Sequence, residues 1–288
     1  MYQSHKHLKN MKTLLIGFAL LISTYTSFCQ SPAFKIDRLG KGTPVLFLPG
    51  FTTPGSVWNE TIKSLKTKTE AFVVSYAGFN GIPPIDTPWY PTLKHSIIEY
   101  IKSENLTNVV IVGHSMGGNL AVDIAAALPS RIFKLVLVDA IPCMRELMMP
   151  GVPASQIQYK NPYNDQRLKM SDEAFRQIAT MMAGNMTINT LKIDTLTKWI
   201  LEADRKTYVY GYTDLLKLDL RPELEKVKAK TLILGASFPS AEVAQQTFEK
   251  QYSNLKNKTI YLADKSKHFI MFDQPLWLFD KLNAFLAK

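Results

Sequence analysis

The sequence predicts an α/β fold in which a mostly parallel sheet is flanked by helices. Short β-branched runs alternate with helical stretches along most of the chain, as parallel strands joined by crossover helices do. Several of these runs are apolar throughout, which a strand needs when helices cover both faces of its sheet. The alternation breaks between about residues 141 and 229, where helical stretches replace strands, and this break indicates a helical insertion.

The expected strands follow one another at residues 45–48, 72–76, 109–112, 135–138, 231–234 and 259–262. Leu93, Ile97 and Ile101 are spaced by four residues and mark the buried face of one helix. Residues 120–128 form another helix, which ends before Pro129. The closing run at residues 276–286 is expected to be a final helix that packs against the sheet.

The first 29 residues have the order of a secretory signal peptide, with a basic start, an apolar run at residues 14–22 and a polar stretch. Small residues at Ser27 and Cys29 fit cleavage before Gln30, so we expect an exported protein, periplasmic or secreted. The apolar run is shorter than the roughly 20 residues of a membrane span, and we expect no stable membrane anchor. Lipidation of Cys29 is a weaker alternative, because Phe28 stands where a lipidation signal has a small residue.

The mature chain is expected to form one core domain from residues 30–140 and 230–288, with residues 141–229 as a helical cap or lid. Ligands of open α/β sheets bind at the carboxyl ends of the strands, which an insertion between two strands would cover. Seven of the eleven methionines lie in this insertion. Flexible thioethers suit a lid over varied apolar groups, although they also fill ordinary helical cores.

The composition argues against several classes of protein. The formal net charge is +10, but basic residues alternate with acids, as at Glu223, Glu225 and Lys226, so we expect solvated helix faces and no nucleic-acid binding. Cys143 is the one cysteine beyond the leader and has no partner for an internal disulfide. Metal-ligand and phosphate-loop motifs are missing from the sequence, and we expect no cofactor and no metal.

A candidate nucleophile follows the third strand. Residues 113–118 read GHSMGG and lead into an alanine-rich helix, so Ser115 lies at a turn between a strand and a helix. This is the context that a G-x-S-x-G motif needs to expose a reactive serine. The glycines leave room for the neighbouring chain, and the positive end of the helix faces the charge that develops on the substrate.

The chain resembles the α/β-hydrolase superfamily over about residues 34–288, in the turn at Ser115, the upstream turn at residues 48–51, the lid-like insertion and a late histidine. More narrowly, it is similar to small bacterial esterase-like serine hydrolases in its loops PGFTTPG at residues 49–55 and YAGFNG at residues 76–81. The resemblance implies the α/β-hydrolase fold with a helical lid. Such a resemblance specifies the fold and the catalytic residues more firmly than it specifies the reaction.

His268 is the candidate general base, because a serine hydroxyl needs an imidazole to take its proton. Of the other histidines, His5 and His7 belong to the leader, and His95 is expected to face solvent on a helix. We expect the side chain of His114 to point away from Ser115. His268 lies after the last strand, and serine before histidine is the chain order of this fold.

The oxyanion hole and the third catalytic residue are assigned from the same resemblance. The N–H groups of Met116 and Phe51 correspond to the two oxyanion donors of the fold. The usual aspartate is missing after residues 231–234. Asp139, at the end of the preceding strand, is the best substitute, although it could equally brace a loop; Glu242 is second.

The function expected from these residues is hydrolysis of a carboxylic ester, or of a thioester, lactone or amide, through an acyl-enzyme on Ser115. The partner is therefore a small-molecule acyl substrate, and the oligomeric state is left open. An aminopeptidase-like peptide hydrolase is a second possibility, because acids in the lid could hold a free amine; the candidates are Glu146, Asp172, Glu173 and Asp204. A third is a non-catalytic ligand-binding protein on the hydrolase scaffold.

Overall fold

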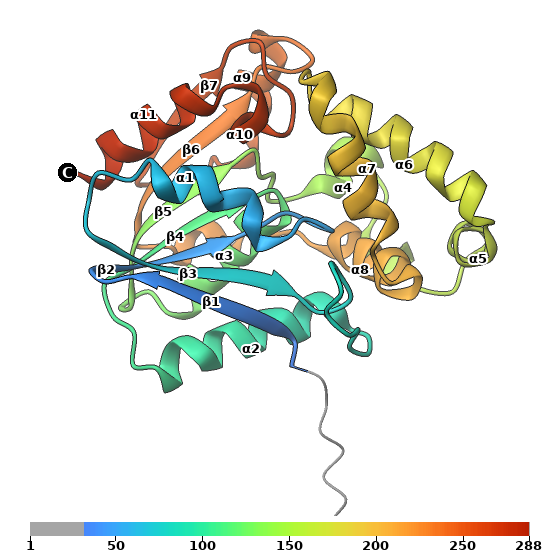
Figure 1. Ribbon diagram of the computed structural model, residues 1–288, viewed down its shortest axis with the longest axis horizontal. Coiled ribbons are helices and arrows are strands. Elements are labelled where there is room, and N and C mark those ends of the chain that lie inside the picture. The colour runs from blue at the N-terminus through green and yellow to red at the C-terminus, as the bar shows by residue number, and fades with distance from the viewer. Residues whose placement is uncertain (1–31, 288) are drawn as a thin grey trace, which may run out of the picture. The chain divides into compact units, whose positions relative to one another are not determined.

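The structure is a computed structural model in which residues 32–287 are described; the predicted leader at residues 1–29 and its cleavage point lie outside this range. Seven strands form one sheet in the order β1-β3-β2-β4-β5-β6-β7 (Figure 1). Strand β1 runs antiparallel to β3, and all other neighbours are parallel. The predicted α/β class is thereby confirmed.

All six predicted strands are present, each at least as long as expected, as β2 (Thr43–Leu48), β3 (Thr69–Tyr76), β4 (Val109–His114), β5 (Ile132–Val138), β6 (Lys230–Ala236) and β7 (Lys258–Ala263). The prediction missed β1 (Phe34–Gly40), an edge strand that is largely exposed. Its sequence, FKIDRLG, carries no apolar run, because only one of its edges and little of its surface are covered.

Alternate residues of the central strands enter two separate cores. Leu46, Ile111 and Leu135 belong to the core that also contains residues of α2 (Trp89–Ser103) and α3 (Met116–Ala127). Their neighbours, among them Val45, Val110 and Val136, belong to the opposite core with α11 (Pro275–Leu286). Burial on both faces explains why these strands are apolar at successive positions. The remaining helices of the core region are α1 (Asn59–Lys63), α9 (Ala241–Gln251), α10 (Ile270–Asp273) and the 3-10 turns Gly55–Trp58 and Glu223–Lys226.

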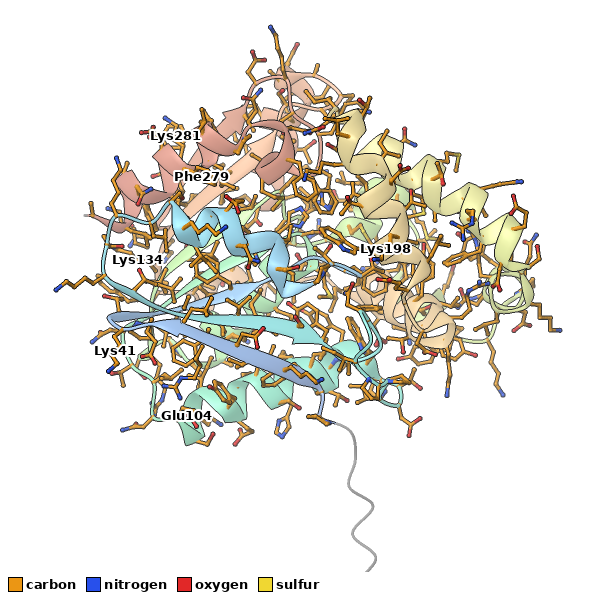
Figure 2. The ribbon with its side chains drawn as sticks, viewed as in Figure 1. Lys41, Glu104, Lys134, Lys198, Phe279 and Lys281 are labelled. Carbon is orange, nitrogen blue, oxygen red and sulfur yellow. The ribbon has the colours of Figure 1, made fainter. Side chains whose placement is uncertain are left out.

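Lys134 shows how the sheet holds its flanking helices. Its side chain is almost fully buried, and Nζ donates to the carbonyl oxygens of Phe285 and Leu286, at 3.3 and 3.2 Å, at the end of α11. Figure 2 labels this residue in β5 together with Phe279 and Lys281 of α11. A cation at a helix C-terminus interacts favourably with the exposed carbonyl groups. Burial lowers the pKa of Lys134.

Between β5 and β6 the chain forms the helices α4 (Met144–Met148), α5 (Pro162–Lys169), α6 (Asp172–Met186), α7 (Ile193–Leu201) and α8 (Arg205–Lys217), which we call the cap helices, with the 3-10 turns Ala154–Gln156 and Thr190–Lys192. They lie beyond the ends of the strand arrows (Figure 1). Asn161, Ser171 and Asp204 begin α5, α6 and α8 by accepting a backbone N–H, which is the preferred role of these residue types. Among residues 32–287, no helix has the length and apolar character needed to cross a bilayer.

Candidate active site

Ser115 occupies a strained turn between β4 and α3. Its backbone angles, φ 53° and ψ −122°, lie in a region that residues with a side chain rarely adopt. The turn is closed by backbone packing: a Cβ on Gly113 would lie 2.3 Å from the carbonyl oxygen of Gly117, and one on Gly117 would lie 2.2 Å from that of Leu48. Only glycine fits at either position, which accounts for both glycines of the motif.

The backbone around Ser115 is fixed by hydrogen bonds on both sides of the turn. Its N–H donates to the carbonyl oxygen of Val138 at 2.9 Å, and its own carbonyl oxygen accepts from the N–H of Gly118 at 2.8 Å. The Oγ atom has no hydrogen-bond partner among residues 32–287, His268 included, although both residues line one pocket. The hydroxyl is therefore free to turn toward a ligand.

His268 lies in the loop between β7 and α10 and pairs with Asp139. Its Nδ1 is 2.7 Å from Asp139 Oδ2, and both side chains are partly buried, with 30% and 17% of their surface exposed. The other carboxylate oxygen, Oδ1, accepts the N–H of Ala236 at 2.8 Å. Asp139 thus contacts the imidazole and braces the end of β6 at once, one oxygen for each.

Asp139 reaches the imidazole because of where β5 ends. Its N–H donates to the carbonyl oxygen of Leu234 in the adjacent strand, and its positive φ of 43° turns the chain out of the sheet. Aspartate tolerates this conformation better than most residues. Glu242, the second candidate, lies exposed in the first turn of α9, where it accepts from Gln246, and the structure does not bring it to His268.

His114 was not predicted to take part in the site. We expected its side chain to point away from Ser115 and gave it no role; its ring packs against that of His268, with centroids 4.6 Å apart, and the residue lines the pocket that contains Ser115. Its Nε2 lies 2.9 Å from the carbonyl oxygen of His268, so Nε2 carries the proton that is donated there. Complete burial and the neighbouring His268 hold the pKa of His114 well below its ordinary value of 6.5.

A second unpredicted residue, Asp273, fixes the loop that carries His268. Its Oδ2 accepts the N–H of Lys267 at 2.8 Å, while Oδ1 accepts the Thr187 hydroxyl and the N–H of Ile188, the latter at 3.1 Å. The N–H of Phe269 also donates to the carbonyl oxygen of Met186 at 2.9 Å. The loop is thereby tied to the end of cap helix α6. The contacts with Met186, Thr187 and Ile188 join residues more than 80 positions apart in the chain, so no local pattern reveals them.

The two predicted oxyanion donors flank Ser115. Met116 is the first residue of α3, and Phe51 follows β2. Neither N–H donates to an acceptor within residues 32–287. The preceding turn is held by the buried Tyr76 hydroxyl, which donates to the carbonyl oxygen of Pro49 at 3.1 Å. The Phe51 ring packs on Phe79, with 4.9 Å between centroids, and on Tyr208 and Tyr212 of α8, at 5.8 and 6.1 Å.

A cavity of about 170 Å³ opens above Ser115 and His268. Its wall is aromatic and aliphatic, with Phe51 from the core and, from the cap helices, Met144, Met182, Met186, Leu196, Trp199, Ile200, Tyr208, Tyr212 and Leu215. No aspartate, glutamate, lysine or arginine of residues 32–287 lines it. The site can therefore bring an uncharged apolar group to the serine, and burial raises the pKa of the Tyr212 hydroxyl to about 12, which keeps it neutral.

The four acidic residues considered for a free amine have other partners. Glu146 pairs with Arg221 and Lys250, and Asp172 pairs with Arg205. Asp204 caps α8, and Glu173 accepts from a neighbouring glutamine on the exposed side of α6. None of the four lines the catalytic pocket.

The fold is that of a known family. Residues 45–281 match the alpha/beta hydrolase family, and the chain belongs to it. Among similar proteins, a pimeloyl-[acyl-carrier protein] methyl ester esterase of Aeromonas hydrophila is 25% identical over 88% of this chain and 99% of its own length. The sn-1-specific diacylglycerol lipase ABHD11 of Danio rerio is 22% identical over 87% of this chain and 80% of its own length.

Solved structures share the fold. An esterase from Exiguobacterium antarcticum superposes with a TM-score of 0.74 at 19% identity, over 90% of this chain and 99% of its own. The epoxide hydrolase CorEH superposes with a TM-score of 0.67 at 15% identity, over 88% and 99%. Because esterases and an epoxide hydrolase both have this fold, the fold alone does not select the reaction.

Proposed function

We propose that the protein is a serine hydrolase that cleaves carboxylic esters through an acyl-enzyme on Ser115. The observation that carries this proposal is the Asp139–His268 contact of 2.7 Å at the pocket that also contains Ser115. A carboxylate that accepts from Nδ1 leaves Nε2 unprotonated, which is the tautomer a general base needs. The hydrolase family and the esterases among its relatives support the same class of reaction.

In the proposed mechanism, Ser115 Oγ attacks the substrate carbonyl carbon while His268 Nε2 takes the hydroxyl proton. The N–H groups of Phe51 and Met116 donate to the oxygen that becomes negative, at the positive end of α3. The imidazolium then returns its proton to the leaving alcohol, and water attacks the acyl-enzyme by the same route. Asp139 offsets the positive charge of the imidazolium in both steps. The Ser115–His268 hydrogen bond forms when substrate excludes water, since catalytic hydrogen bonds often tighten only in the complex.

The pocket favours an ester over a peptide with a free N-terminus. An aminopeptidase has to hold an ammonium group, yet the acids of the cap helices are paired or exposed elsewhere. An apolar wall without charged side chains suits the hydrocarbon part of an acyl group. We therefore place ester hydrolysis ahead of amide or peptide hydrolysis.

The test is turnover of p-nitrophenyl esters of graded acyl length beside amino-acid p-nitroanilides. We expect ester hydrolysis, little anilide hydrolysis, and a loss on the order of 10³-fold or more in Ser115→Ala with unchanged thermal stability. Ester turnover that survives in Ser115→Ala would move the nucleophile elsewhere. Preferred anilide cleavage would select the peptidase, and a folded protein without any turnover would select the ligand-binding protein.

We also propose that the enzyme is exported and acts after cleavage before Gln30. The support for this is the basic, apolar and polar order of the first 29 residues. The N-terminal sequence of the mature protein tests it directly.

A further inference from the structure

We propose that a second cavity, on the far side of Tyr212, receives the distal part of a long acyl chain whose carbonyl is bound at Ser115. This inference rests on the proposed ester hydrolysis and names its substrate class, esters of medium- and long-chain acids. The second cavity has a volume of about 330 Å³ and lies within the cap helices and their connections; it is lined by Met148, Met149, Gln156, Ile157, Gln158, Asn161, Tyr163, Asn164, Tyr212, Thr213 and Leu216.

The same two helices form walls of both cavities. In α8, Leu215 lines the catalytic pocket and Leu216 the second cavity, while Tyr212 lines both. In α4, Met144 lines the catalytic pocket, and Met148, one helical turn further, lines the second cavity. A chain that leaves the catalytic pocket along these helices therefore meets Tyr212 and then the second cavity.

Tyr212 separates the two cavities by a weak contact. Its hydroxyl donates to Met148 Sδ at 3.2 Å, and a thioether sulfur is a poor acceptor. The methionine side chain is unbranched and adaptable, so it can follow a movement of the tyrosine. Rotation of Tyr212 would join the cavities without breaking a strong hydrogen bond.

The lining of the second cavity selects a hydrocarbon rather than a polar group. No charged side chain of the described residues lines it. Three of its four amides already have partners: Asn164 Nδ2 donates to Tyr159 O at 2.8 Å and to Thr213 Oγ1 at 2.9 Å, Gln158 Nε2 donates to Ser155 O at 2.7 Å, and Asn161 Nδ2 donates to Gln158 O at 2.6 Å. The surface left to an occupant is chiefly that of methionine, isoleucine, leucine and tyrosine.

The volumes of the two cavities indicate which acyl chains are long enough to need the second one. A cavity of about 150 Å³ accepts a six-carbon ring such as benzene. The catalytic pocket, at about 170 Å³, therefore holds an acyl group of roughly six carbons. Longer chains have to extend beyond it, and the second cavity offers about 330 Å³ more.

The experiment compares kcat/KM for p-nitrophenyl decanoate with that for p-nitrophenyl butyrate in Met148→Glu, with Met181→Glu as the matched control. Both methionines are exposed, 55% and 62%, so glutamate is tolerated at each; Met181 lines neither cavity. A carboxylate in the second cavity opposes an apolar chain. We expect the decanoate-to-butyrate ratio to fall about tenfold or more in Met148→Glu and to stay at the wild-type value in Met181→Glu.

Tyr212→Ala tests the separating wall in the opposite direction. Its ratio should rise, and adding Met148→Glu should lower it again, because the chain then still passes Met148. The inference would be overturned if Met148→Glu left the decanoate-to-butyrate ratio unchanged, or if the wild-type enzyme cleaved only short esters. In either case, butyrate turnover that depends on Ser115 would leave the proposed function standing. A wild-type enzyme that cleaves neither ester would instead remove the proposed function, and this inference with it.

Discussion

Asp139→Asn is expected to lower kcat by about 10³- to 10⁴-fold while the protein keeps its fold. The carboxylate serves two donors, the N–H of Ala236 and Nδ1 of His268. An amide has one oxygen, so it can accept from only one of the two. Which donor it serves decides the tautomer of the imidazole.

Two orientations of the asparagine can be compared. If its oxygen faced His268, its NH₂ group would oppose the N–H of Ala236 and leave two donors unpaired, at a cost of about 1–3 kcal/mol. If its oxygen faces Ala236, the NH₂ group faces Nδ1, which must give up its proton to accept. The second orientation is therefore preferred by roughly one to three kcal/mol. It places the proton on Nε2, where His268 can no longer accept from Ser115.

The assay is steady-state hydrolysis of p-nitrophenyl butyrate beside thermal unfolding, with Glu242→Gln as the control. Since the Ala236 contact is kept, we expect the free energy of unfolding of Asp139→Asn to stay within about 1 kcal/mol of wild type. Glu242→Gln should keep kcat, because among residues 32–287 this exposed carboxylate accepts only from Gln246 and has no contact with His268. A kcat for Asp139→Asn within tenfold of wild type would refute the assignment, and a crippled Glu242→Gln enzyme would reverse it.

Three further outcomes are expected. Gly211→Ala should lower kcat about tenfold relative to Gly184→Ala in the same assay. A Cβ on Gly211 would lie 3.0 Å from the Phe51 ring and shift this proposed oxyanion donor, whereas a Cβ on Gly184 meets nothing within 4 Å. Folded His114 stays neutral below pH 6.5, whereas the same residue of the unfolded chain takes up a proton there. Each pH unit below 6.5 should therefore lower the free energy of unfolding by up to about 1.4 kcal/mol. In chemical denaturation, the free energy of unfolding of His114→Gln should fall less steeply as the pH falls below 6.5. Edman sequencing of the exported protein should begin at Gln30, and an intact leader would contradict export with cleavage.

The parts of the fold that could be predicted are those with a local physical signature. Burial on both faces makes the runs at residues 45–48, 109–112 and 135–138 apolar throughout, and the turn at Ser115 demands glycines at fixed offsets. The contact of Asp139 with His268 followed from topology, since the carboxyl ends of adjacent parallel strands meet at one edge. The catalytic role of that contact stays a prediction.

The remainder depends on packing between distant segments. The ring of His114 lies against His268 only because the loop after β7 returns over the end of β4. The cap methionines look alike in the sequence, yet Met182 lines the catalytic pocket and Met148 the second cavity, while Met181 lines neither. The surroundings of each methionine depend on which side of the cap faces the sheet. Periodicity within one helix does not specify that side.

The central claim is that Ser115 is an activated nucleophile, and the most direct measurement is the intact mass of the protein after reaction with a fluorophosphonate. Only a serine whose hydroxyl is activated by a base forms the covalent phosphonyl adduct readily. We predict one adduct per chain, located by peptide mapping on Ser115, and none in Ser115→Ala or after unfolding. A folded wild-type protein that remains unmodified, or an adduct that persists in Ser115→Ala, would contradict it.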